Sequence, residues 1–342
     1  MKFVHEVHQQ RVCFDTGAAA ERLVEEVARL SATRVMVIAT SSSRAAAERI
    51  TAGLPVAHWH DDVVMHVPVE VAERARAAAK GMDALVSVGG GSTTGLAKAV
   101  ALTSGLPIVA VPTTYAGSEA TAVWGLTEGT RKTTGTDPRV LPRSIVYDAS
   151  LTTGLPVAMS VASGLNALAH CVDSMWAPNT DPIDQALAGE GIRALRTGLP
   201  KVVAAPEDLP GREEVLYAAY LAAAAFASAG SGLHHKICHV LGGMFALPHA
   251  QTHAVVLPHV LALNGPAAPA AQERIAAALA QPLPELLATL GAPRALRDLG
   301  MPADGIPAAV DAILPVAPAS NPAPVTEETM TELLRAAWEG TR

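Results

Sequence analysis

The chain has 342 residues, of which 50% are hydrophobic and 17% are charged, and its formal net charge is -7 at pH 7. This composition is typical of a globular protein with room for two cores, and it excludes a disordered chain. The acidic balance and the lack of a basic run argue against nucleic acid as a partner.

Short apolar runs rich in branched residues recur through the first half of the chain. They predict strands at residues 34–39, 63–67, 84–88, 107–111 and 144–147, with helical stretches at 18–30 and 44–52 between them. Strands that alternate with helices predict a parallel sheet covered on both faces. After Asp148 the pattern becomes helical. We therefore expect an α/β dinucleotide-binding domain at residues 1–153 and an all-α substrate and catalytic domain at 154–342.

A glycine turn follows the strand predicted at 84–88, and a helix is predicted after it at 96–102. The turn contains Gly89, Gly90, Gly91 and Ser92, and the next strand ends in a second loop of small residues that includes Thr113, Thr114 and Ser118. A strand, a glycine turn and a helix let backbone N–H groups approach a diphosphate. A glycine run alone is also consistent with a plain tight turn. Two such loops at one sheet edge, however, predict a nucleotide site.

The residues after the first predicted strand bear on the choice of cofactor. Ser41 and Arg44 lie where many dinucleotide folds place an acidic residue that binds the adenosine ribose, and no acidic residue is present. This favours tolerance of NADPH as well as NADH. Arg44 either binds the 2′-phosphate or merely begins a solvated helix. We take Lys132 as a further candidate for cofactor binding.

Residues 231–253 hold the most specific pattern in the chain, SGLHHKICHVLGGMFALPHAQTH. If residues 233–245 form a helix, His235 and His239 project from one face, and His249 follows the helix. Asn166 and His170 repeat the four-residue step upstream. A single histidine on an apolar helix is usually a hydrogen-bonded core residue. Several buried imidazoles instead indicate a shared ligand, metal or substrate.

Together these features resemble the iron-containing alcohol dehydrogenase family, which shares its fold with dehydroquinate synthase and glycerol dehydrogenase. The resemblance runs from the GGGS turn and the TT loop through Asp148 to Asn321-Pro322. It implies an NAD(P)H-dependent oxidoreductase. The family's metal ligands fall on Asn166, His170, His235 and His249, and its histidine near the nicotinamide falls on His239. By this resemblance the four histidines are the catalytic residues.

Three departures narrow the resemblance to one branch of that family. Asn166 replaces the metal-binding aspartate, Gly95 replaces another aspartate, and PTTYAGSE is one residue shorter than the common loop. With GLNALAHC and GLHHKICHVLGG, they resemble the maleylacetate reductases, which reduce the carbon–carbon double bond of a dicarboxylate to give 3-oxoadipate in aromatic-ring degradation. Without a carboxylate at position 166 we expect no catalytic metal. If one binds, its ligands are His170, His235 and His249.

A small dicarboxylate substrate requires cations or dense hydrogen-bond donors. Lys236 is the main candidate, although it could instead reach solvent along its helix. The other candidates are Asn166, Tyr115, His234 and His253.

Three other functions remain open. A metal-dependent alcohol or polyol dehydrogenase shares the fold, and three histidines suffice for some zinc sites. A dehydroquinate-synthase-like lyase would need more basic residues at the site. A nucleotide-binding protein without activity would not require the histidines.

The remaining features concern the setting of the protein. Its three cysteines, Cys13, Cys171 and Cys238, show no CxxC spacing, and residues 1–10 lack the apolar core of a signal peptide. Both observations predict reduced thiols in the cytoplasm. Residues 216–233 carry no charge, but their many alanines predict a buried core helix rather than a membrane span. The family resemblance implies a homodimer.

Overall fold

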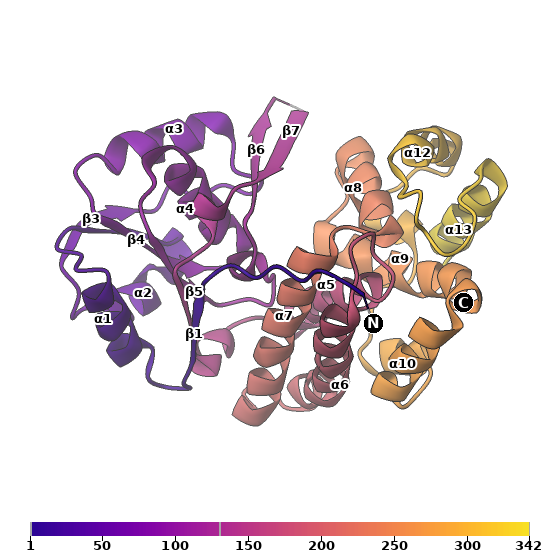
Figure 1. Cartoon of the computed structure of the whole chain (residues 1–342), viewed down its shortest axis with the longest axis horizontal. Helices are drawn as coiled ribbons and strands as arrows, with labels where there is room; N and C mark the ends of the chain where they lie inside the picture. The colour runs from indigo at the N-terminus through magenta and orange to yellow at the C-terminus, as the bar shows by residue number, and fades with distance from the viewer. Residues whose placement is uncertain (1, 130, 342) are drawn as a thin grey trace. The chain divides into compact units, whose positions relative to one another are not determined.

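The computed structural model describes residues 2–129 and 131–341, which form two compact units (Figure 1). The α/β unit is Val7–Leu155, and the helical unit begins at Pro156. The division lies two residues after the predicted boundary. Residues 2–6 belong to the helical unit, which the sequence pattern did not predict.

The α/β unit contains a parallel sheet of six strands in the order β1-β8-β5-β4-β2-β3. The strands are β1 Arg11–Phe14, β2 Val35–Ile38, β3 Val56–His60, β4 Ala84–Gly89, β5 Ile108–Pro112 and β8 Ser144–Tyr147. From β2 the chain continues to β3 on one side, and it returns to place β4 on the other side of β2. This reversal puts the loops after β2 and β4 at the switch point, where ligands bind in open α/β sheets.

Helices cover both faces of this sheet (Figure 1). Helices α1 (Ala19–Arg29) and α2 (Arg44–Thr51) share a core with Val35 and Val37 of β2, whereas α3 (Val69–Ala78) and α4 (Gly91–Ser104) pack with Met36 and Ile38. Successive side chains of a strand point to opposite faces, so β2 contributes to both cores. The predicted parallel sheet with helices on both faces is confirmed.

The strand predicted at residues 63–67 is wrong. His66 and Val67 have φ angles of 65° and 49°, and the Val67 N–H closes a turn onto Val64 O. This left-handed backbone is incompatible with a strand. The elements that the sequence pattern missed are β1, β3, α3 and an antiparallel hairpin of β6 (Val123–Glu128) and β7 (Arg131–Thr136).

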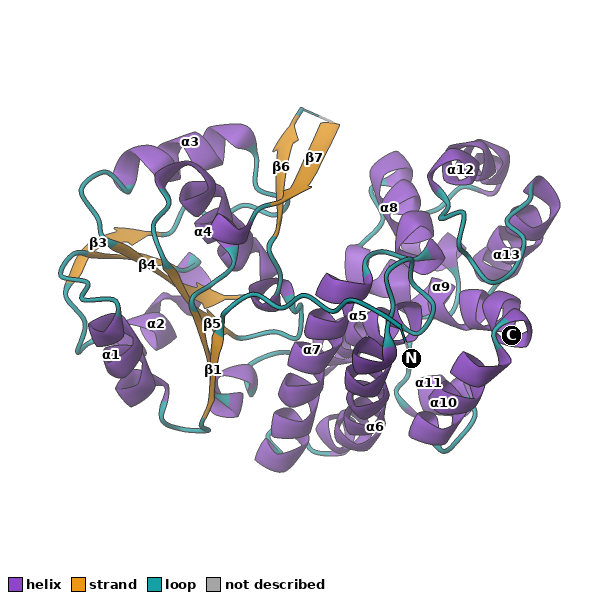
Figure 2. Cartoon of the chain, in the orientation of Figure 1, coloured by secondary structure: helices purple, strands orange, loops and turns teal. Residues whose placement is uncertain are grey.

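The described part of the second unit contains helices and no strands, as Figure 2 shows. Its helices are α5 Val157–Ser174, α6 Pro182–Ala204, α7 Leu209–Ala229, α8 Leu233–Phe245, α9 His249–Asn264, α10 Pro269–Leu279, α11 Leu283–Thr289, α12 Ile306–Ile313 and α13 Glu327–Glu339. One core joins α8, α9, α12 and α13. At the end of α9, Asn264 and Asn321 exchange two amide hydrogen bonds of 3.0 and 2.8 Å. The all-α character of this unit is confirmed.

Residues 216–233 do not form the single helix that we expected. Helix α7 ends at Ala229, Gly230 has a φ of 84°, and α8 starts after Gly232. Leu216, Ala219 and Ala223 of α7 are buried inside the unit. Among the described residues, no single helix is long and apolar enough to cross a membrane. Helices α7 and α8 are together long and apolar enough to do so, by length and composition only, but the chain bends by 99° between them.

Candidate functional site

The glycine turn after β4 forms the start of α4. Gly89 has a φ of 152°, which only glycine adopts readily, and Gly90 precedes the first helical residue, Gly91. No side chain caps this end of α4. Backbone N–H groups at an uncapped helix start favour an anion such as a diphosphate. The residues present therefore fit a dinucleotide cofactor.

The second small-residue loop lies against this turn, as predicted. The Thr113 N–H donates a 3.0 Å hydrogen bond to Gly89 O, and a Cβ at Gly90 would lie 3.0 Å from Thr114 Cγ2. The two loops thus approach so closely that the turn has no room for a side chain at Gly90. Ser92 is partly exposed in the first turn of α4.

A buried lysine that the sequence reasoning missed anchors the second loop. Lys98 Nζ, on α4, donates hydrogen bonds of 2.6 Å to Ser118 O, 2.7 Å to Thr121 O and 2.8 Å to Val123 O. These bonds hold the backbone around Ser118, one of the predicted cofactor residues. Lys132, another of them, lies in β7, and its side chain is outside the described part of the chain.

Ser41 and Arg44 lie directly after β2, beside the switch point. Ser41 begins a short 3₁₀ turn, and Arg44 begins α2. Arg44 Nε donates to Glu48 Oε1 at 2.7 Å, and its guanidinium carbon lies 4.0 Å from the Trp59 ring centroid. These contacts support the interpretation that Arg44 begins a solvated helix. A guanidinium has five N–H donors, so others remain for a 2′-phosphate.

Six histidines of α5, α8 and α9 form two layers. His239 on α8 and His249 on α9 are exposed, and His170 on α5 is partly exposed. The layer behind them, His234, His235 and His253, is at most 2% exposed. The structure thus brings together all four predicted catalytic histidines and places three of them where a small molecule can reach.

Ring contacts connect the two layers. The His170 and His235 rings stack with centroids 4.8 Å apart, and the His239 and His249 rings stack at 6.1 Å. His249 also meets the buried His253 edge-on at 4.4 Å. The turn between α8 and α9 makes this possible, because Ala246 ends α8 with a left-handed φ of 52° and α9 then begins at His249.

A buried carboxylate orients one of these rings. Asp173 Oδ2 on α5 accepts hydrogen bonds from His235 Nδ1 at 2.7 Å and from the Gly232 N–H at 2.9 Å. With its proton on Nδ1, a neutral His235 presents Nε2, which makes no hydrogen bond in the structure, as an acceptor. Asp173 was missed, although its spacing from Asn166 and His170 puts all three on one helix face.

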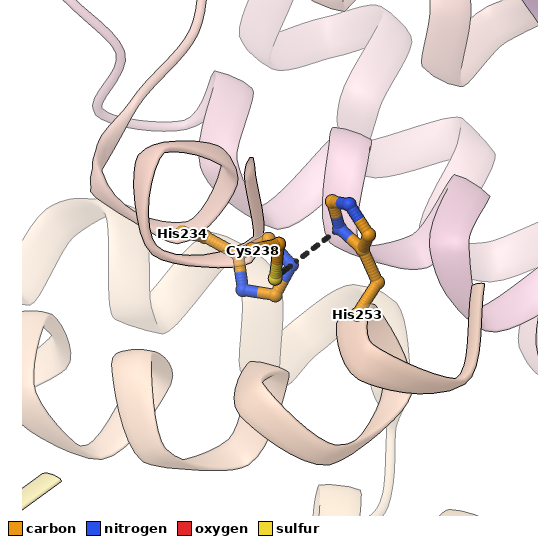
Figure 3. A group of neighbouring side chains, drawn as sticks. All are labelled: His234, Cys238 and His253. Atoms are coloured by element: carbon orange, nitrogen blue, oxygen red, sulfur yellow. Dashed lines mark hydrogen bonds between the residues drawn. The ribbon is translucent and has the colours of Figure 1, made fainter. Parts of the chain in front are cut away.

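Figure 3 shows a second buried group, His234 and Cys238 from α8 with His253 from α9. His234 Nε2 and His253 Nδ1 are 2.9 Å apart, and Cys238 Sγ lies 3.7 Å from His234 Nε2. The first separation is that of a hydrogen bond between the two rings. As arranged here, the group is a hydrogen-bonded pair of rings with a thiol beside it.

Burial controls the charge of these rings. It lowers the pKa of His170 and of His234 to about 3, with smaller contributions from neighbouring histidines, and it lowers the pKa values of His235 and His253 well below the ordinary range. Burial also raises the pKa of Asp173 to about 7, although its hydrogen bonds oppose that shift. At neutral pH these four histidines are therefore uncharged hydrogen-bonding groups.

The structure distributes the predicted substrate residues over both units. Asn166 on α5 is 5% exposed, and its Oδ1 makes no hydrogen bond. Lys236 on α8 is partly exposed, whereas Tyr115 is buried in the α/β unit with its hydroxyl 3.4 Å from Thr152 Oγ1. His234 and His253 lie in the buried layer, so direct contact with a substrate would require them to move.

The donor set lacks the negatively charged ligand of the metal site that the family resemblance implies. Its four positions are an amide, Asn166, and three histidines, so none carries a negative charge. The nearby carboxylate, Asp173, is already bonded to His235 and to Gly232. Metal sites of this kind usually include an anionic ligand that balances the charge. In the described part of the chain, two groups of three side chains have ligand atoms that all lie within 4.8 Å of one another. The set of His170, His235 and His249 is not one of them.

Comparisons with known proteins agree with both units. Residues 9–149 match the model of the iron-containing alcohol dehydrogenases, and residues 160–338 match the C-terminal model of that family. A maleylacetate reductase of Burkholderia cepacia is 45% identical, with 99% of each chain covered. Among solved structures, an iron-containing alcohol dehydrogenase of Corynebacterium glutamicum is 57% identical with a TM-score of 0.98, covering 100% of this chain and 98% of that one. A maleylacetate reductase of Agrobacterium tumefaciens is 41% identical with a TM-score of 0.96, covering 100% and 99%.

Proposed function

The chain belongs to the iron-containing alcohol dehydrogenase family, and from that premise we propose that it reduces the carbon–carbon double bond of maleylacetate with NAD(P)H. The observation that carries the proposal is the buried amide of Asn166 beside uncharged histidines, in the place of a charged metal-binding set. Likeness to maleylacetate reductases over the full length supports the choice of substrate.

The α/β unit would hold the cofactor. Gly89, Gly90, Gly91 and Ser92 would bind its diphosphate through backbone N–H groups, with Thr113 and Thr114 beside them. When bound, the nicotinamide supplies the hydride. We propose that both NADH and NADPH serve, because residues 39–44, directly after β2, carry no carboxylate that would repel a 2′-phosphate.

The histidine layers suit the charge that this reaction develops. Hydride adds to the alkene carbon that is β to the ketone, and the electron pair moves through the adjacent carbon onto the ketone oxygen as an enolate. A proton then goes to that adjacent carbon, which completes the saturated product. Neutral imidazole N–H groups can stabilise the enolate oxygen without a metal. His170 and His249 would serve in this way, His235, whose N–H is bound to Asp173, would shape the pocket, and His239 would deliver the proton.

The two carboxylates of the substrate need positive charge. Lys236 is partly exposed on α8, one residue from His235, and makes no ion pair among the described residues. We propose that it binds one carboxylate. Asn166 would donate a hydrogen bond from its amide.

A cofactor-oxidation assay with maleylacetate, run before and after exhaustive chelation, tests the proposal. We expect equal rates in both states and no oxidation of simple alcohols or polyols. A rate that chelation abolishes and that iron or zinc restores, together with alcohol oxidation, would establish a metal-dependent alcohol dehydrogenase instead.

We further propose that the protein works as a cytoplasmic homodimer. This rests on the family resemblance and on its three free cysteines. Light scattering coupled to size exclusion would measure the mass of the assembly, and fractionation of the host cell would locate it.

A further inference from the structure

A second cluster of ligating side chains lies far from the histidine layers in sequence. His5 Nδ1 is 2.8 Å from Asp181 Oδ2 and 3.8 Å from Asp184 Oδ1. Asp181 precedes α6, Asp184 lies in its first turn, and Ser228 Oγ of α7 is 3.3 Å from the same His5 nitrogen. The ligand atoms of His5, Asp181 and Asp184 all lie within 4.8 Å of one another.

The two aspartate side chains lie in the interior of the unit. The side chain of Asp184 is 0% exposed, and neither of its oxygens makes a hydrogen bond that meets the usual distance and angle limits. Burial, and then the charge of Asp181, raise the pKa of Asp184. Among the described residues, His5 is the one ion-pair partner of either aspartate. A buried carboxyl without hydrogen bonds either keeps its proton or pairs with a cation, and a cation bound here would meet both aspartates.

Asp181 is already fixed in a ligating position. Its Oδ1 accepts the N–H groups of Ile183 and Asp184 at 2.7 and 3.0 Å, which caps α6 and leaves Oδ2 directed at His5. Burial acts to raise the pKa of Asp181, but the hydrogen bonds from the Asp184 N–H and from His5 outweigh it and keep that pKa below its ordinary value. A charged carboxylate oxygen therefore faces the imidazole nitrogen.

We propose that His5 Nδ1, Asp181 Oδ2 and the Asp184 carboxylate bind one divalent transition-metal ion of the zinc class. Ligand atoms on a tetrahedral zinc lie about 3.4 Å apart, since each bond is about 2.0–2.2 Å long. The observed separations of 2.8 and 3.8 Å bracket that value, so each changes by about half an ångström on binding. Water completes the coordination, because the His5 side chain is 12% exposed.

Such an ion would attach the N-terminal segment to the helical unit. Residues 2–6 lie in no helix or strand and Val4 is 91% exposed, whereas His5 contacts Asp181 and Ser228 of the helical unit. The site lies at the start of α6, whereas the histidine layers are built from α5, α8 and α9. The proposal is therefore independent of the metal-free reduction proposed above.

Zinc titration of the chelated full-length protein, followed by calorimetry and by thermal unfolding, tests this site. We expect the native chain to bind one more equivalent of zinc than His5→Gln, and its Tm to rise with zinc more than that of the variant. Asp181→Asn keeps a good helix cap but removes a charged ligand, so it should weaken this zinc at least tenfold. His8→Gln changes an exposed histidine nearby and is the matched control.

The difference between the variants decides the outcome, whether or not the histidine layers also bind zinc. Equal zinc equivalents and equal Tm shifts in the native protein and in His5→Gln would overturn the site. His5 and Asp181 would then be joined only by their hydrogen bond. A third variant, Asp184→Asn, removes the buried ligand and should also lose this zinc. If it does not fold, His5→Gln still tests the site, because His5 lies outside every helix and strand. Neither measurement uses activity, so its failure is distinguishable from failure of the proposed reduction.

Discussion

The two candidate binding regions are built from different parts of the chain. In the α/β unit, main-chain groups of Gly89–Ser92 and Thr113–Thr114 form the predicted cofactor site, and a Cβ at Gly90 would already crowd Thr114. In the helical unit, side chains of α5, α8 and α9 form the site, and burial sets their charge. The first region should therefore be sensitive to added volume and the second to changes in charge, which the following predictions test.

The largest expected effect is acid sensitivity of the helical unit. His170, His234, His235 and His253 all have folded pKa values below the ordinary 6.5, so the unfolded chain binds more protons over the interval between the two values. Stability therefore rises with pH through this interval and is lost as pH falls below 6.5. The raised pKa of Asp173 makes stability fall as pH rises between 3.8 and 7. This is the contribution of one group, whereas four histidines contribute in the other direction.

We expect the helical unit to lose on the order of several kcal/mol between pH 6.5 and 4.5. Hydrogen exchange of α5, α8 and α9 against pH would measure it. In the α/β unit, where burial lowers the pKa of His60, the β4 and β5 amides are the internal reference. Equal loss of stability in the two units at low pH would contradict the expectation that the buried histidines make the helical unit more sensitive to acid.

Replacement of the exposed proton donor comes next. His239→Ala should lower kcat by about 100-fold or more, about 2.7 kcal/mol, because a general acid typically contributes at least that factor. The affinity for NAD(P)H should stay unchanged, since the predicted cofactor site is main chain of the other unit. The limb of the pH profile in which kcat falls as pH rises should vanish. His8→Ala is the control, and a near-normal kcat in His239→Ala would assign the proton to another group.

Lys236→Met removes the positive charge that we propose binds a substrate carboxylate, and it keeps most of the length of the side chain. KM for maleylacetate should rise about tenfold or more, about 1.4 kcal/mol, with little change in kcat. Steady-state kinetics with NADH at saturation would measure this. An unchanged KM would show that Lys236 only reaches solvent along α8.

A smaller effect is expected from Arg44→Ala. If the guanidinium binds the 2′-phosphate, the affinity for NADPH should fall a few-fold more than the affinity for NADH. Fluorescence titration of both cofactors would give the ratio. Equal losses would show that Arg44, through Glu48 and Trp59, only supports α2.

Ala246→Gly should have the smallest effect and the opposite sign. Ala246 has a φ of 52° at the end of α8, where glycine is strain-free. The variant should gain about 0.5–1 kcal/mol, less the entropy that glycine adds to the unfolded chain. Thermal unfolding would measure the gain. A lower Tm would mean that this turn tolerates alanine without strain.

The sequence predicted best where one periodicity dominates. The expected bounds of α8, residues 233–245, and of β8, residues 144–147, agree with the structure. Strand β3 was missed because it lies at the sheet edge with partly exposed His58 and Trp59, so it lacks a continuous apolar run. The false strand at residues 63–67 is apolar enough, but its left-handed residues are invisible to periodicity.

The residues of the candidate site were also predicted best where a single periodicity dominates. The four-residue steps at Asn166 and at His235 identified the histidine layers, because helix geometry converts spacing directly into proximity. Which rings are buried was not predictable, since that depends on how α9 packs against α5 and α8. Lys98 was missed because a lone lysine in an alanine-rich helix gives no sign that its amine meets three backbone carbonyls.

The paired amides of Asn264 and Asn321 at the end of α9 affect how fast the protein deamidates on storage. Asn264 is followed by Gly265, a sequence in which the backbone nitrogen readily attacks the side-chain amide and releases ammonia when the chain is flexible. In the folded unit Asn264 is 0% exposed and its amide donates to Asn321, so the attack must wait for local opening. The carboxylate formed would no longer donate that hydrogen bond. The fraction of deamidated Asn264 in a stored sample should therefore record how often this corner of the helical unit has opened.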